Sequence, residues 1–175
     1  MRAAFVEHGA QELMPIALAD DATSLEKVVD PWLPQAADLA IPRAAETSTS
    51  VAESSAPPRV VIAFGSQTGN AESIAGMLTE QLEERHITVE RTASLNTVID
   101  DGVLDKDKGP VTVFAVCSTC GDGDFPDNAG KVKRWAKKLN PDALAHVRVA
   151  VLALGSTDYS NFCMAGQRLR AAFVE

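Results

Sequence analysis

From residue 60 onward, short apolar runs alternate with amphipathic stretches. Runs that suit strands lie at 60–64, 87–92, 111–117 and 147–154, and the second of them is the weakest. Apolar residues at helical spacing lie at 71–85, while 131–139 suits an exposed helix rich in lysine and 162–175 suits the start of another helix. Because strands and helices alternate, the pattern predicts parallel strands in a three-layer α/β sheet.

The first third of the chain predicts two further elements and a linker. Residues 13–18 suit a strand, which makes five strands in all, and residues 24–39 suit a helix that bends at Pro31 and Pro34. Residues 41–58 have almost no large apolar side chains, so they cannot bury enough surface to offset the entropy of ordering them. We therefore expect 41–58 to be a linker.

The composition narrows the class of protein. The chain has 175 residues, 46% apolar and 23% charged, which is typical of one globular domain. A net charge of −8 argues against nucleic-acid binding, because phosphate contacts need clustered Lys and Arg. No apolar run reaches the length of a membrane span, and the first residues lack the apolar core of a signal peptide. We expect a cytoplasmic protein with free thiols, no nucleic-acid partner and no membrane partner.

The loop after the strand at 60–64 has the composition of a phosphate site. Ser66, Thr68 and Asn70 supply side-chain donors, and Gly69 lets the backbone approach an anion closely. The loop has no Lys or Arg, so it differs from nucleoside triphosphate loops and fits a terminal monophosphate. The plainer alternative is a helix N-cap formed by Thr68 or Asn70.

Two more loops follow strands that we expect to be buried. Residues 117–128 combine two glycines with small polar residues, which leaves room for a flat ring beside the backbone. The alternative is a long turn that ends in a helix cap at Asp127. Residues 154–163 include Tyr159, the one tyrosine of the chain, at the carboxyl end of a strand. Open α/β sheets bind ligands at that end of their strands.

Cysteines and histidines offer two other kinds of chemistry. Cys117 and Cys120 have the spacing of a redox dithiol, but such a motif should open a helix, whereas here it leaves a strand. The three histidines are far apart and lack acidic or cysteine neighbours at ligand spacing. We expect free thiols and no metal site.

Together the loops at 66–71, 118–121 and 154–163 resemble the FMN loops of flavodoxin-like domains in the diflavin reductase family. The methionine synthase reductase branch of that family is similar in the Ser-Thr pair at 118–119, the Gly-Asp-Gly-Asp run at 121–124 and Tyr159. The likeness is continuous over 59–175. It implies an α/β, three-layer flavodoxin-like fold with a five-stranded parallel sheet in the order 2-1-3-4-5.

The resemblance also implies a role for each loop. The FMN phosphate would be wrapped by Ser66, Gln67, Thr68, Gly69, Asn70 and Ala71. One side of the isoalloxazine ring would be lined by Ser118, Thr119, Cys120 and Gly121. Tyr159 would stack on the other side, and Asp20 would lie near the cofactor. The ribityl chain and ring edge would follow the rest of the third loop, which is Leu154, Gly155, Ser156, Thr157, Asp158, Ser160, Asn161, Phe162 and Cys163.

Residues 1–40 resemble the last strand and helix of the same domain, placed before its beginning. The hexapeptide Arg-Ala-Ala-Phe-Val-Glu occurs at 2–7 and again at 170–175, so it marks one point of the domain that is reached from both sides. The resemblance thus implies a circularly permuted domain in three parts. Residues 1–40 are the displaced strand and helix, 41–58 the linker and 59–175 the main part. A true permutant and one period of a tandem array both fit.

Only one copy of the hexapeptide can occupy the helix end that leads into the strand at 13–18. We expect the other copy to fray or lie outside the core, in a monomer with mobile ends and some swapped dimer. If the copy at 2–7 fills the position, deletion of 170–175 should cost little stability.

The function implied by the resemblance is that of an FMN-binding electron-transfer module. It would shuttle single electrons between a flavin reductase and an acceptor protein, with no catalytic side chains of its own. At most it is one module of an NADPH-dependent diflavin oxidoreductase, because the chain has no second domain for NADPH or FAD. Two alternatives are open: a flavin-free interaction module of the same fold, and a rearranged fragment of a larger diflavin reductase.

Overall fold

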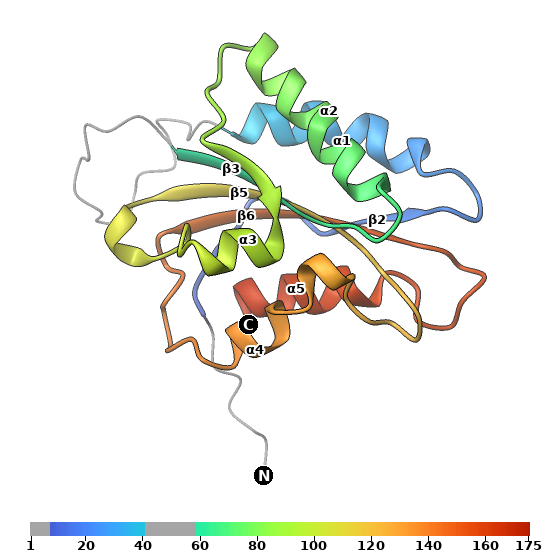
Figure 1. Cartoon of the computed structure of the whole chain (residues 1–175). Helices are drawn as coiled ribbons and strands as arrows, with labels where there is room; N and C mark the ends of the chain where they lie inside the picture. Colours follow the sequence, from blue (N-terminus) through green and yellow to red (C-terminus); the bar gives the residue numbers. More distant parts are fainter. Residues whose placement is uncertain (1–7, 41–58) are drawn as a thin grey trace.

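The computed structural model describes residues 8–40 and 59–175, which form a parallel sheet between two layers of helices (Figure 1). The sheet order is β4–β3–β5–β6, and β1 and β2 both pair with β6 at its outer edge. The strands are β1 (Gln11–Glu12), β2 (Ala17–Asp20), β3 (Arg59–Gly65), β4 (Arg91–Ser94), β5 (Val111–Ser118) and β6 (Val147–Gly155). The predicted three-layer α/β fold with parallel strands is therefore confirmed.

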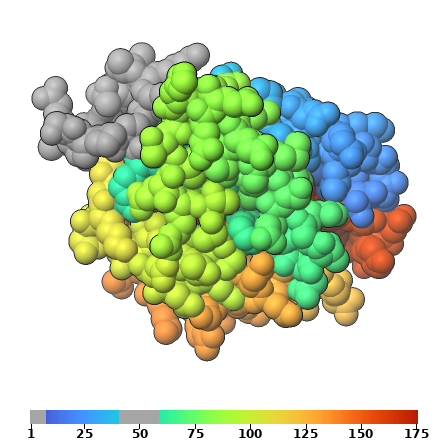
Figure 2. All heavy atoms as spheres, turned by 45° about the horizontal axis from the view of Figure 1, so that its top comes forward, coloured from blue at the N-terminus to red at the C-terminus, as the bar shows by residue number. Residues whose placement is uncertain are grey.

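Helices cover both faces of this sheet. One face carries α1 (Glu26–Leu39) and α2 (Asn70–Glu84), which lie side by side in Figure 2. The opposite face carries α3 (Leu95–Asp100), α4 (Val132–Ala136) and α5 (Met164–Val174). Two short 3-10 helices, η1 (Lys106–Lys108) and η2 (Asp127–Ala129), lie in connecting segments. None of the helices in the described ranges is long and apolar enough to cross a membrane.

The apolar runs form two cores because successive strand side chains point to opposite faces. In β5, Phe114 and Val116 belong to the core under α1 and α2, while Val113 and Ala115 belong to the core under α3, α4 and α5. All four are fully buried. Trp32 of α1 packs edge-on against Phe114, with ring centroids 6.4 Å apart, so the N-terminal segment is part of the first core.

The edge strand differs from the prediction of one strand at 13–18. It is divided into β1 and β2, so the sheet has six strands in the described residues instead of five. Pro15 lies in the gap, and a proline cannot donate a backbone hydrogen bond to the ladder on β6. Leu13 keeps one such bond, from its N–H to the Val149 carbonyl oxygen at 2.8 Å.

Several predicted bounds were wrong by a few residues. The strand expected at 87–92 is β4, which begins at Arg91, because Ile87 and Val89 pack on the core without joining the ladder. The helix expected at 131–139 is α4 and has five residues. It tightens into i−3 hydrogen bonds at its end, from Lys138 N to Trp135 O at 2.9 Å. The helix expected at 162–175 is α5, which begins at Met164.

The first described residues and the C-terminal end of α5 lie together below the sheet in Figure 1. The C-terminal copy of the hexapeptide completes α5, and its Phe173 is 1% exposed. Residues 8–10 lie against it, with Ala10 N donating to Phe173 O at 3.3 Å. The idea that the N-terminal copy fills this position is therefore wrong for this structure. Residues 1–7 and the predicted linker at 41–58 lie outside the described residues.

Candidate functional site

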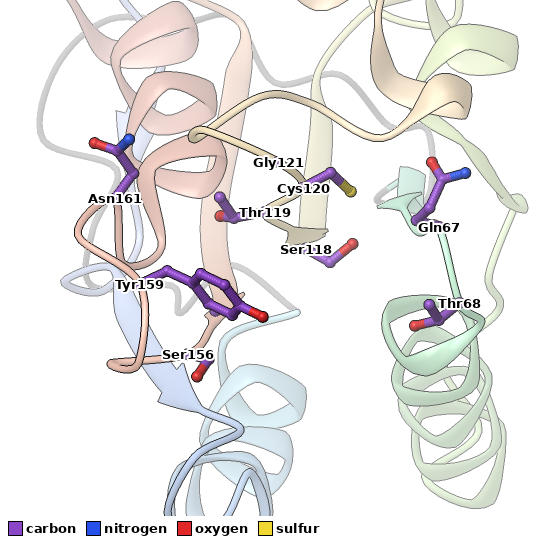
Figure 3. Close-up of a pocket in the computed structure, with 10 residues that line it drawn as sticks. Gln67, Thr68, Ser118, Thr119, Cys120, Gly121, Ser156, Tyr159 and Asn161 are labelled. Carbon is purple, nitrogen blue, oxygen red and sulfur yellow. The ribbon is translucent and has the colours of Figure 1, made fainter.

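Three loops meet at the carboxyl edge of the sheet, where β3, β5 and β6 end. They enclose a cavity of about 400 Å³ (Figure 3), which is within the usual size range of ligand sites. Ten residues line it: Gln67, Thr68, Ser118, Thr119, Cys120, Gly121, Gly155, Ser156, Tyr159 and Asn161. Every one of these residues was predicted from the sequence, and the lining has no Lys or Arg.

The first loop leads directly into a helix whose N-terminus has no side-chain cap. The N-cap of α2 is Gly69, at φ +99°, so neither Thr68 nor Asn70 takes that position. Gly69 N donates to the Ser66 hydroxyl at 3.0 Å, which folds the loop back on itself. The first-turn N–H groups of a helix have no partner within it, so this end of α2 favours an anion.

Side chains from the second loop hold the first loop in place. Ser66 N donates to Asn128 Oδ1 at 2.9 Å. The Gln67 amide makes two contacts with Asp127: Nε2 donates to Oδ2 at 3.4 Å, and Oε1 accepts from the backbone N–H at 3.2 Å. These roles of Asn128 and Asp127 were not predicted, because nothing in their local sequence shows which loop they face.

The second loop is a tight turn fixed at both ends. The backbones of Cys120 and Asp124 exchange two hydrogen bonds, at 2.9 and 2.8 Å. Thr119 N donates to Leu154 O at 3.0 Å, and its hydroxyl accepts from Ala165 N at 3.2 Å, at the start of α5. The walls of the cavity that come from this loop are therefore preorganised by backbone contacts.

The third loop presents an aromatic ring to the cavity. Tyr159 is 70% exposed, and Figure 3 shows its ring directed into the space between the loops, with Gln67 and Thr68 on the far side. Asp20 lies behind this loop and accepts from Thr157 N at 3.0 Å and from the Thr157 hydroxyl at 2.8 Å. The pKa of Asp20 is lowered, mainly by the backbone hydrogen bond from Thr157, so this carboxylate stays ionised.

The cysteines near the cavity are free thiols. Burial raises the pKa of Cys120, and the carboxylates of Asp127 and Asp124 raise it further. Burial also raises the pKa of Cys117 far above its usual range and that of Cys163 to about 12. Raised pKa values keep the thiols protonated and poorly nucleophilic, and Cys117 lies within β5 instead of at a helix start.

The remaining predicted residues do not line the cavity. Ala71, Leu154 and Cys163 are buried behind it. Ser66, Gly69 and Asn70 shape the start of α2, and Asp20 fastens the third loop from behind. The other predicted residues that the lining does not include are Thr157, Asp158, Ser160 and Phe162.

This arrangement fits FMN. One end of the cavity has neutral hydroxyl and amide groups beside an uncapped helix start, which suits a phosphate. The other end has an exposed aromatic ring facing small residues across an open space, which suits a flat ring. Cys120 lies across the cavity from Tyr159 and is not aromatic, so Tyr159 supplies the single aromatic face of the lining.

The sequence pattern of the flavodoxin family matches residues 62–175. The chain is 33% identical over 111 residues to methionine synthase reductase from Bos taurus, which covers 62% of this chain and 15% of that protein. It is 33% identical over 132 residues to the sulfite reductase [NADPH] flavoprotein alpha-component of Mannheimia succiniciproducens, covering 73% of this chain and 20% of that protein.

A solved structure agrees with these sequence matches. A mutant flavodoxin from Pseudomonas aeruginosa superposes with a TM-score of 0.50 at 25% identity, over 66% of this chain and 73% of that one. The chain spans only 15 to 20% of the length of the two reductases, so it corresponds to one part of them. This chain belongs to the flavodoxin family, and it is an FMN-binding electron-transfer module.

Proposed function

We propose that the chain holds FMN in the three-loop cavity and passes electrons one at a time from a flavin reductase to an acceptor protein. The observation that carries this proposal is that all ten lining residues come from the carboxyl ends of β5 and β6 and from the loops after β3, β5 and β6. When bound, FMN supplies the redox chemistry, while the protein holds the flavin and sets its surroundings.

The first loop would hold the phosphate. Ser66, Gln67, Thr68, Gly69, Asn70 and Ala71 span the turn and the start of α2, where backbone and hydroxyl donors gather. Because the donors are neutral and the helix end is only partly positive, the site suits a terminal phosphate without a counter-charged side chain.

The second and third loops would hold the ring. Ser118, Thr119, Cys120 and Gly121 line one wall of the cavity, and Tyr159 would face the flavin ring from the third loop. The rest of 154–163 would follow the ribityl chain. Asp20 would affect the cofactor indirectly, because it fixes the third loop through Thr157 and places a negative charge behind that loop.

The partners would be redox proteins that present a basic surface to this acidic chain of net charge −8. The donor we favour is a flavin reductase that draws on NADPH, because the sulfite reductase flavoprotein relative carries NADPH in its name. We further propose a cytoplasmic location, a monomer with some swapped dimer, and no membrane or nucleic-acid partner.

An anaerobic reductive titration of the FMN-loaded full chain tests single-electron transfer. Dithionite is added stepwise, and flavin absorbance is recorded against electron equivalents. We expect two resolved stages of one electron each, followed by transfer to ferricytochrome c on mixing. A single two-electron stage would contradict the one-electron role. A folded protein that stays colourless after addition of FMN would instead indicate an interaction module.

A further inference from the structure

The end of α5 and residues 8–10 together form one helix-ending motif, although they come from opposite ends of the sequence. In a Schellman motif the N–H of the sixth residue bonds to the carbonyl of the first, and the fifth residue is left-handed. If His8 followed Glu175 directly, Phe173 would be the first residue, Gly9 the fifth and Ala10 the sixth. Ala10 N donates to Phe173 O at 3.3 Å, and Gly9 has φ +84°.

The Ala10–Phe173 hydrogen bond and the left-handed Gly9 thus match the pattern expected if His8 followed Glu175 in one chain. His8 adds a second contact, because its Nδ1 hydrogen bonds to the Ala172 carbonyl oxygen at 3.0 Å. His8 is itself buried. Leu144 N donates to His8 O at 2.8 Å, which holds the capping segment from its other side.

The C-terminal hexapeptide is recognised by its side chains. Arg170 makes two contacts with Glu12: Nε to Oε1 at 2.6 Å and Nη2 to Oε2 at 2.7 Å. Phe173 packs against Trp135 with ring centroids 5.6 Å apart, and its side chain is 1% exposed. These contacts define a slot between β1, α4 and residues 8–10 that selects an arginine and a phenylalanine three positions apart.

The same arginine and phenylalanine recur three positions apart just before His8. Residues 2–7 repeat 170–175 in full, with Arg2 in the place of Arg170 and Phe5 in the place of Phe173. Glu7 is bonded to His8, so a copy at 2–7 in the slot would reach the cap with no connecting loop.

We propose that the slot is a binding site for the Arg-Ala-Ala-Phe-Val-Glu segment, and that residues 2–7 bind in it when 170–175 leave it. The C-terminal copy is the preferred occupant of the slot, because it continues α5 from Leu169 without a break in the helix. With the N-terminal copy bound, the break would fall inside the helix instead of after it, which costs helical hydrogen bonds. The N-terminal copy is therefore the reserve ligand.

Thermal unfolding of full-length variants tests this exchange. Phe5→Ala alone should leave the melting temperature unchanged. Phe173→Ala alone should lower it by only a few degrees, because the reserve copy brings Phe5 into the same position. The double variant empties the position in both copies and should lose roughly 6–20 °C, the range for a buried phenylalanine in a chain of this size.

A second background controls for a general effect of Phe5. Leu152 is fully buried in the core on the other face of the sheet. Adding Phe5→Ala to Leu152→Ala should change nothing, whereas adding it to Phe173→Ala should produce most of the loss. Equal melting temperatures for Phe173→Ala and the double variant, or failure of Phe173→Ala alone to fold, would overturn the proposal.

The Trp135 indole gives a readout that does not depend on stability. Its ¹H–¹⁵N signal senses the ring of Phe173, so it should stay near its wild-type position in Phe173→Ala and move in the double variant. A shift that is already complete in Phe173→Ala would show an empty slot and overturn the proposal. Rescue that grows with protein concentration and comes with a dimer would overturn exchange within one chain in favour of exchange between chains.

Discussion

Tyr159 is a large side chain that the folded chain leaves 70% exposed at the edge of the cavity. Its ring is the aromatic face that the described lining offers to a flavin. Tyr159→Ala should weaken FMN binding by about 0.5–1.5 kcal/mol or somewhat more, which is roughly 2- to 13-fold in Kd. Flavin fluorescence quenching measures the change.

The matched control is Tyr159→Phe. It keeps the ring and removes only the hydroxyl, so its affinity for FMN should stay close to that of the natural chain. If the alanine variant binds FMN with unchanged affinity and spectrum, Tyr159 does not belong to the site.

His146 makes stability depend on pH. Burial, its largest influence, lowers the pKa of His146 below the ordinary value of 6.5. Its Nε2 hydrogen bonds to the Leu104 carbonyl oxygen at 3.0 Å, while Nδ1 is buried without a partner among the described residues. His146 takes up a proton more readily in the unfolded chain than in the folded one. The stability that neutral His146 contributes is therefore present above about pH 6.5 and is lost as the pH falls below that value.

Replacing the histidine isolates its share of the pH effect. His146→Gln keeps a donor for Leu104 O but does not titrate. Between pH 7.5 and 5.5 the melting temperature of the natural chain should fall further than that of the variant. Parallel losses in the two proteins would show that other groups cause the decline.

At the scale of elements, the close approach of α5 to β6 depends on Gly166. A Cβ atom at Gly166 would lie 2.8 Å from Ala153 Cα and closer still to Ala153 Cβ. Gly166→Ala should therefore push the helix off the sheet, at a cost of about 1–3 kcal/mol in the free energy of unfolding. Urea unfolding measures the loss.

A second helical glycine supplies the control. Gly76 lies in α2, where an added Cβ meets nothing within 4 Å. Gly76→Ala should raise the free energy of unfolding by about 0.5–1 kcal/mol, because alanine has the better helix propensity. Similar effects of the two substitutions would mean that propensity, and not the contact with Ala153, decides the result at Gly166.

The buried elements were the ones that the sequence predicts well. In β3, β5 and β6 both faces are apolar, so the pattern and the structure agree to within two residues at each end. The edge strand was less predictable, because β1 and β2 are partly exposed and Pro15 interrupts them. The short α4 was overestimated because lysines at helical spacing fit a helix and a turn equally well.

In the site, too, the features set by local sequence were predictable and those set by tertiary contacts were not. Loops after buried strands can be found from glycine and hydroxyl content, and the ten lining residues were all among those predicted. The contacts of Asn128 with Ser66 and of Asp127 with Gln67 join loops about 60 positions apart. A local sequence pattern does not show which distant residues meet, so these contacts can be identified only once the fold is known.

For the whole molecule, the sheet order bears on how the chain is organised. β2 from the N-terminal part pairs in parallel with β6, and residues 8–10 cap α5. We therefore predict that a rearranged chain, residues 59–175 followed directly by 8–40, folds and binds FMN. The new peptide bond would join Glu175 to His8, where residues 8–10 already cap the end of α5 through hydrogen bonds to Ala172 O and Phe173 O.

Circular dichroism, thermal melting and FMN titration of the rearranged chain check this organisation of 1–40, 41–58 and 59–175. Stability within a few degrees of the natural chain supports a permuted domain with a dispensable linker. An insoluble product, or a folded one that no longer binds FMN, would contradict it.

We expect the three-loop cavity to hold FMN with its phosphate at the start of α2. Fluorescence titration of the full chain with FMN, riboflavin and FAD tests it most directly, with Thr68→Val as the variant that removes one hydroxyl from the first loop. We predict that FMN binds at least about tenfold more tightly than riboflavin, and more tightly than FAD. Thr68→Val should weaken FMN by roughly 10- to 150-fold and leave riboflavin unchanged. Equal affinity for FMN and riboflavin would contradict the account.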